Sequence, residues 1–407
     1  MSKNLTRKGL AFGALVALGA SVFAGAPAYA ADTVVLAPNY SSDTTLATAV
    51  TGTFSLNASL APGSTAANIS QLAYKIVNNG AAQVDFSAVS GGNAADTGSV
   101  TAVEGNEYVT AATLTATALT SNTLALSISG ASATTTTQTV TVTAFIDANL
   151  NGTVEAGEAQ ASQTVSFVKH SEITSSTTIT APTENDTTVT AVVKFNNINN
   201  QSLTSANVGA VFTKGDGTTL TPAVPSIASG TIASSVATYT TAAAHGLVVG
   251  QIVTIAGVTG ATTQGNLNSA QAVTAVGSTT TFSVATTGAG SVTVSSATAT
   301  PNNVYSNVAY SATAGGFKYV TSVQGTLAKG TAVKVQPLYS ASALTASSGN
   351  TVGTAATAEV VARVLGSFVG NTVKSTTASA AASAAASVTQ NVSLNGEKQV
   401  YFLAKDT

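Results

Sequence analysis

The chain has 407 residues, and only 7% of them are Asp, Glu, Lys or Arg. Its formal net charge of −2 at pH 7 excludes the basic surface that nucleic-acid binding requires. The lack of Cys excludes a disulfide framework, while 44% hydrophobic residues supply enough apolar material for packed cores.

The N-terminus has the pattern of a secretory signal peptide. Lys3, Arg7 and Lys8 precede the apolar run "GLAFGALVALGASVFAGA", which ends in the small-residue cleavage motif "APAYA". A membrane anchor is the alternative, but the run is rich in Gly and Ala and stops at a good cleavage site. Residues 1–30 are therefore predicted to be removed on export, which leaves eleven basic and sixteen acidic residues and a net charge of −5. No later segment is long and apolar enough to span a bilayer.

Period-two alternation of apolar residues runs through the remaining chain. In "LALSISG", Leu124, Leu126 and Ile128 are expected to face one side of a strand. Turn signals such as "NNG", "GDG" and "AGG" separate these runs at short intervals. The pattern predicts an all-β fold of Ig-like β-sandwiches rather than an α/β fold.

A weak internal repeat predicts two sandwiches in tandem. Residues 52–89 can be aligned with residues 188–224, since each reads strand, polar loop, strand, Gly turn and strand. "TVTVTAFID" with "QTVSFV" likewise matches "TAVKVQPLY" with "AEVVARVL". Two copies of one sandwich explain both matches.

The second copy contains an extra stretch, which predicts an inserted small β module over residues 231–299. Its "HGLVVGQIVTIAGV" opening and "FSV" strand resemble a β module that recurs in bacterial surface proteins and phage structural proteins. The resemblance implies a structural or decorating role and carries no catalytic residues.

The C-terminal part changes composition. "KSTTASAAASAAASVTQ" is low-complexity and is interpreted as a linker, with a short Ala-rich helix as the alternative. "NVSLNGEKQVYFLAKDT" reads as one β-hairpin, which cannot form a domain alone. The sequence leaves open whether it pairs with a partner chain or reflects a truncation. The expected organisation is signal peptide 1–30, sandwich 31–170, sandwich 171–230 with 300–366, inserted module 231–299, linker 367–390 and hairpin 391–407.

"DANLNGTVEAGE", residues 147–158, carries the strongest motif. It fits the twelve-residue calcium loop D-x-[DN]-x-[DN]-G-x₅-E, in which side-chain oxygens converge on one ion and a Gly at position six permits a sharp turn. The calcium ligands that this spacing predicts are Asp147, Asn149, Asn151, Thr153 through its backbone carbonyl, Glu155 and Glu158.

The flanks of this loop are expected to be strands rather than the two helices of an EF-hand. The loop resembles the "D.N.NG..D.GE" hairpin loops of extracellular Ig-like bacterial surface proteins, with Glu155 in place of the usual Asp. A polar hairpin tip that needs no metal is the alternative. With three carboxylates, affinity is expected at the weak extracellular end, with a Kd of about 10⁻⁴–10⁻³ M. The equivalent loop of the second sandwich, "SASALTASSGNTVG", has no acid and is expected to bind nothing.

Catalysis finds little support in the sequence. His170 and His245 are the only histidines, and neither lies in an evident nucleophile–His–acid arrangement. The remaining acids are scattered, without a paired-carboxylate pattern. We therefore expect no enzymatic activity.

An exported chain of tandem sandwiches with a calcium loop resembles bacterial surface-layer or cell-surface array proteins. The resemblance implies a structural protein at the cell surface, with calcium as its cofactor and copies of itself as partners. Cell-wall glycan is a further possible partner. The alternative is a surface adhesin or carbohydrate-binding protein that uses Tyr-bearing loops such as "GNEYV" and "NNVYSNVAYS".

Overall fold

The computed structural model describes residues 33–60, 72–89, 96–100, 107–110, 121–129, 137–220, 223–259, 267–287, 290–323, 325–345, 350–362, 373–375 and 400–402. Strands dominate these residues, and the helices among them are short 3-10 turns. The prediction of an all-β fold is confirmed. The signal-peptide segment 1–30 lies outside the described residues.

The chain divides into two compact units. Unit 1 comprises Met1–Leu46 and Thr53–Phe167, and unit 2 comprises Ala47–Gly52 and Val168–Thr407. The division lies just before the expected boundary at residues 170/171. It also places a short segment of the expected first sandwich, residues 47–52, in unit 2.

Unit 1 contains two layers of antiparallel strands with the orders β1-β3-β8-β5-β6 and β10-β9-β4-β7. In an Ig-type sandwich one sheet has the order A-B-E-D and the other contains C, F and G. Here β1, β3, β4, β5, β8, β9 and β10 take the places A to G in chain order, so the unit is Ig-like. The strands are β1 (Val34–Pro38), β3 (Thr53–Leu60), β4 (Leu72–Asn78), β5 (Gln83–Val89), β6 (Asp96–Val100), β7 (Glu107–Thr110), β8 (Ser121–Ser129), β9 (Gln138–Ile146) and β10 (Gln160–Val168).

Alternating apolar side chains build the core of unit 1. Leu124 and Leu126 of β8 are fully buried, as the alternation predicts, whereas Ile128 is half-buried. They are joined in the buried set by Phe54 of β3 and Phe145 of β9. Burying such side chains removes apolar surface from water, which is the main favourable contribution to folding.

Unit 2 repeats the Ig-like order. One sheet runs β11-β12-β22-β21, and β13, β23 and β25 take the places C, F and G in the other. The first two strands of the aligned segments 52–89 and 188–224 are equivalent, since β12 and β13 match β3 and β4. The third is not, because the place of β5 is taken by β21, which lies outside residues 188–224. The elements are η2 (His170–Glu172), β11 (Ser175–Ile179), β12 (Thr188–Phe195), η3 (Asn200–Ser202), η4 (Ser205–Asn207), β13 (Val208–Lys214), β21 (Tyr310–Ser311), β22 (Gly316–Ser322), β23 (Ala332–Tyr339), β24 (Asn350–Thr351) and β25 (Ala356–Glu359).

The short segment 47–52, which contains strand β2 (Ala47–Ala49), is built into unit 2. Ala47 and Ala49 belong to the buried core that β12, β13, β22 and β23 enclose. The backbone N–H of Asn199 donates to the carbonyl of Ala47 (2.7 Å), and Ser202 Oγ donates to Thr48 Oγ1 (2.8 Å). This segment thus contributes packing and hydrogen bonds to the second sandwich.

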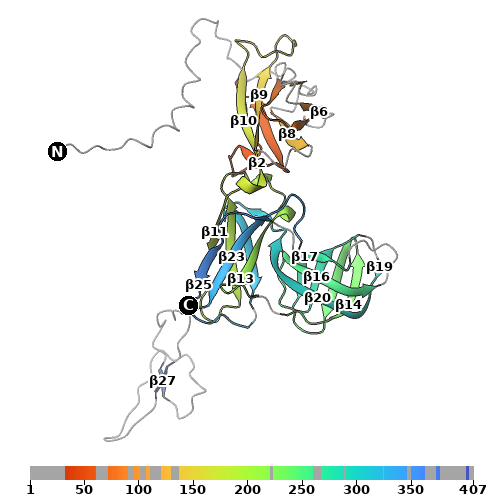
Figure 1. Ribbon diagram of the computed structural model, residues 1–407, viewed down its shortest axis with the longest axis vertical. Helices are drawn as coiled ribbons and strands as arrows, with labels where there is room; N and C mark the ends of the chain where they lie inside the picture. The colour runs from red at the N-terminus through yellow and green to blue at the C-terminus, as the bar shows by residue number, and fades with distance from the viewer. Residues whose placement is uncertain are drawn as a thin grey trace, which may run out of the picture. The chain divides into compact units, whose positions relative to one another are not determined.

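The residues between β13 and β21 form further strands with a core of their own. That core includes Tyr239, Phe282 and Val253, all fully buried. Strand β20 (Thr293–Ser306) pairs with β16 and, through its last residues, with β13 of the sandwich. Figure 1 shows these strands in green and cyan. The strands are β14 (Ile227–Ala233), β15 (Val236–Thr241), β16 (Gln251–Thr259), β17 (Ala270–Ser278), β18 (Thr281–Ala285) and β19 (Gly290–Ser291).

The boundary expected at residues 299/300 falls inside β20, so one strand runs through both the inserted strands and the sandwich. Independent folding of residues 231–299 stays a prediction. In the C-terminal part, β26 (Val373–Ser375) pairs with β27 (Val400–Phe402). The rest of the expected linker 367–390 and hairpin 391–407 lies outside the described residues.

Candidate metal centre

Residues 147–158 connect β9 to β10 at one end of unit 1. The two strands are antiparallel neighbours, with Phe145 opposite Gln160, and Figure 1 shows them side by side. The backbone N–H of Ile146 donates to the carbonyl of Ala159 (3.0 Å) and closes the base of the loop. The flanking elements are strands, so the loop is a β-hairpin connection.

Asp147 anchors the first turn of this loop. Its side chain is fully buried, and its Oδ1 and Oδ2 accept the backbone N–H groups of Asn151 (3.1 Å) and Gly152 (2.9 Å). Gly152 has φ 73°, a left-handed conformation that glycine adopts without a Cβ penalty. The chain therefore wraps around the Asp147 carboxylate.

The two amide side chains of the loop face Glu155. Oδ1 of Asn149 accepts the N–H of Asn151 (3.1 Å), and Oδ1 of Asn151 accepts the N–H of Thr153 (2.7 Å). Their Nδ2 groups donate to the two carboxylate oxygens of Glu155, at 3.0 Å from Asn149 and 2.8 Å from Asn151. Glu155, at the position where the resembled loops have Asp, is long enough to bridge both amides.

Glu158 closes the loop from the other side. Its Oε1 accepts the N–H of Ala148 (3.2 Å), and its Oε2 accepts the N–H of Glu155 (3.0 Å). Five of the six predicted ligand side chains therefore belong to one hydrogen-bonded network. Thr153 joins that network through its backbone N–H.

The chemistry of this donor set fits calcium, a hard cation that takes oxygen ligands. Asp147, Glu155 and Glu158 supply carboxylate oxygens, Asn149 and Asn151 supply amide oxygens, and Thr153 supplies a backbone carbonyl. Bound calcium would hold these oxygens together electrostatically. In the part of the chain that the structure describes, no three His, Cys, Asp or Glu side chains are already gathered as a metal-binding group.

The two histidines lie in separate environments. Nε2 of His170 is 3.3 Å from Thr51 Oγ1, and its ring packs edge-on against Tyr339 at a centroid distance of 4.9 Å. Burial lowers the pKa of His170. Glu172 pairs with Lys169 at 2.9 Å. His245 is buried and accepts the N–H of Leu247 through Nδ1 (2.9 Å).

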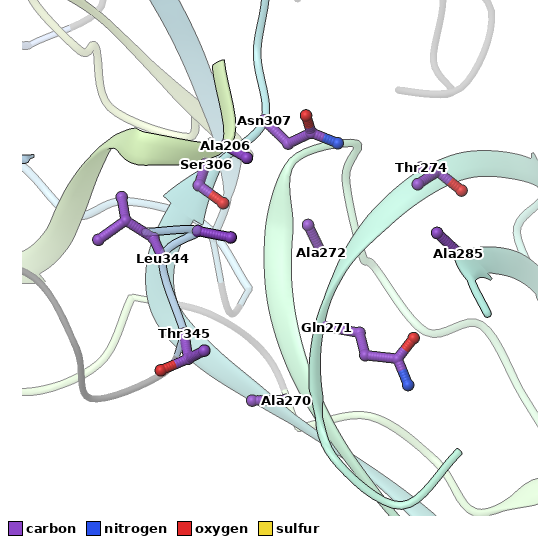
Figure 2. A pocket seen from close by; sticks show the side chains of 11 residues that line it. Ala206, Ala270, Gln271, Ala272, Thr274, Ala285, Ser306, Asn307, Leu344 and Thr345 are labelled. Carbon is purple, nitrogen blue, oxygen red and sulfur yellow. The ribbon is translucent and has the colours of Figure 1, made fainter. Parts of the chain in front are cut away.

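Unit 2 contains a shallow groove of about 240 Å³ that sequence reasoning missed. Small side chains such as Ala270 and Ala272 of β17 face Ala206 and Leu344 of the sandwich across it, as Figure 2 shows. Asn307 lies at its rim. Alanines distant in sequence give no motif, so the groove could be found only from the fold.

None of the helices among the described residues has the length and apolar character needed to cross a membrane.

No protein-family model matches the chain, and no curated protein matches it. Similar solved structures include a marsupial T cell receptor, with 8% identity, a TM-score of 0.21 and coverage of 86% of this chain and 78% of that chain. The BSP domain of a biofilm-associated protein has 11% identity, a TM-score of 0.18 and coverage of 82% and 66%. The collagen adhesin of S. aureus has 9% identity, a TM-score of 0.14 and coverage of 80% and 91%. These TM-scores carry no argument about function, so the Ig-like assignment rests on the strand order within each unit.

Proposed function

We propose that the chain is an exported structural protein of a cell surface, where copies of it assemble into a layer or filament that calcium stabilises. The observation that carries the proposal is the loop 147–158, in which oxygen-bearing side chains at calcium-loop spacing form one network at the end of an Ig-like sandwich. The signal-peptide pattern of residues 1–30 supports export.

Association is supported by the low charge of the chain and by its strand edges. With 7% charged residues, self-repulsion is small. Among the described strands of unit 1, β1 and β6 are the outermost of their sheet, and outer strands can pair with a neighbouring chain. Calcium in the loop would reduce the ordering cost of a contact at that end of the hairpin.

The test is electron microscopy and sedimentation of the exported chain, with millimolar calcium and with chelator. Calcium-dependent sheets or filaments are expected from the wild type, and monomers or small oligomers from Asp147→Ala. Asp216→Ala is the control, because Asp216 also accepts a backbone N–H in a turn, from Thr218 at 2.9 Å, but lies outside the loop. A monodisperse monomer at high concentration in calcium would contradict assembly and favour the alternative that the chain is a surface adhesin. Binding of the chain to cell-wall glycan would then be measured.

A further inference from the structure

Leu150 occupies an unusual position at the tip of the loop. Its side chain is 68% exposed and its φ is 56°, the left-handed region that a branched side chain adopts at a cost. Asn or Gly would fit this conformation better, and a polar side chain would suit the exposure. The stability of a single copy therefore does not explain a leucine here.

The loop presents Leu150 in a fixed way. Its neighbours Asn149 and Asn151 are both tied to Glu155, and Asn151 N–H is tied to Asp147. The tip "NLN" carries no charge, although three carboxylates lie around it. The exposed Leu150 side chain, called the knob below, is therefore apolar and is carried by an ordered loop. Binding of the knob to a partner requires little further loss of conformational freedom.

The groove of unit 2 has matching properties. Ala270, Ala272 and Leu344 pack on a small buried cluster that includes Ile252 and Val304, which gives the groove an apolar floor. Its lining contains no charged residue, so an uncharged tip can enter without burying an unpaired charge. Its volume of about 240 Å³ is many times the roughly 10–15 Å³ that a cavity needs to hold one water, which leaves room for the four carbons of a leucine side chain.

We propose that Leu150 of one copy docks into this groove of a second copy. The inference rests on the proposed self-assembly and names its contact. Because the knob lies in unit 1 and the groove in unit 2, the two surfaces differ, and each copy keeps one of each for further partners. Such a head-to-tail interface extends as a filament or row unless its rotation closes a ring.

Cysteine cross-linking tests the contact directly, because the chain has no Cys of its own. Ala148→Cys, at an exposed position two residues from Leu150, and Ala343→Cys, in the lining of the groove, are mixed as separate proteins in calcium with a mild oxidant, so that Leu150 itself is kept. The mixed disulfide is expected to form about tenfold faster than with Ala148→Cys and Val361→Cys, because docking raises the effective concentration of the thiols. Val361 is 48% exposed and lies beyond β25. Equal rates for the two mixtures would overturn the proposal.

A second variant separates docking from folding. Leu150→Asn suits the left-handed backbone, so thermal stability is expected to be unchanged or higher, while Kd for self-association rises roughly tenfold to a hundredfold. Val249→Asn, at an apolar site 51% exposed and outside both the loop and the groove, is the control and is expected to leave association unchanged. If the wild type assembles in calcium and Leu150→Asn assembles equally well, the docking contact is wrong while the proposed function stands. A wild type that stays monomeric contradicts both.

Discussion

Gly152 donates its backbone N–H to Oδ2 of Asp147 at 2.9 Å, and Asn151 donates to the other oxygen of the same carboxylate. Asp147 is fully buried, so it organises the loop before any metal binds. Removing it affects both the hairpin and the proposed calcium site.

Asp147→Ala is expected to lower the free energy of unfolding of unit 1 by about 2–4 kcal/mol without calcium, because two N–H groups lose their acceptor. It is also expected to abolish stabilisation by calcium. For a Kd near 0.1 mM, that stabilisation is roughly 2.7 kcal/mol at about 10 mM calcium. Denaturant titrations with calcium and with chelator measure both effects. If calcium raises the free energy of unfolding of the variant as much as that of the wild type, the metal binds elsewhere.

Gly152→Ala tests the backbone of the same turn. Alanine at φ 73° costs about 1 kcal/mol, and the cost falls on the loop, so calcium affinity should fall as well. Gly217→Ala is the matched control, since Gly217 has φ 85° and open space around an added Cβ. It should cost a similar amount of stability in unit 2 while leaving calcium binding intact. Calorimetric titration of both variants with calcium measures their affinities. Equal calcium affinities of Gly152→Ala and Gly217→Ala would contradict the role given to Gly152.

The sequence predicted local features well because they depend on neighbouring residues. Alternation placed Leu124 and Leu126 in a sheet core, and motif spacing brought Asp147 and Glu158 into one loop. Nothing local indicated that Ala47 and Ala49 pack in unit 2, because their partners lie far along the chain.

The groove and the bridging role of Glu155 could not be predicted from the sequence either. Ala206, Ala272 and Leu344 come together through strand pairing over long separations. The hydrogen bonds of Glu155 to two amides depend on rotamers that a spacing pattern does not specify. Sequence patterns indicate which residues share a loop or a strand face, while long-range packing decides what they contact.

The pH dependence of unit 2 should reflect His170. Burial lowers its pKa below the ordinary value of 6.5, so near and below that pH the unfolded chain binds more protons than the folded one. Stability therefore falls as the pH falls from about 7 through 6.5 toward the folded pKa. His170→Gln should flatten this slope in thermal unfolding measured across the range. The nearby charges, Lys169 and Glu172, form their own ion pair in both proteins, so a slope that persists undiminished would exclude His170 as its source.

Two buried tyrosines of unit 2 should respond differently to loss of the hydroxyl. Tyr305 hydrogen-bonds to Thr321, whereas the Tyr319 hydroxyl has no hydrogen-bond partner among the described residues. Burial raises the pKa of Tyr319, in keeping with an apolar surrounding. Tyr305→Phe should lower the free energy of unfolding by about 1 kcal/mol. Tyr319→Phe should leave it unchanged or raise it by up to about 1 kcal/mol, because it removes an unsatisfied polar group. Equal losses in chemical denaturation would contradict this difference.

Deleting residues 231–299 should leave the second sandwich folded. The pairing of β20 with β13 uses Val304 to Ser306, which the deletion retains, and the deleted strands have a core of their own. The deletion removes Ile252 from the small cluster that also contains Val304 and Leu338, so some loss of stability is expected as these side chains gain exposure. Calorimetry should still show cooperative unfolding of unit 2 at a lower temperature. Replacing Val304 by Thr in the shortened chain would cover the newly exposed site with a polar β-branched side chain and should improve solubility without changing the fold. A shortened chain without a cooperative transition would show that the inserted strands are integral to the sandwich.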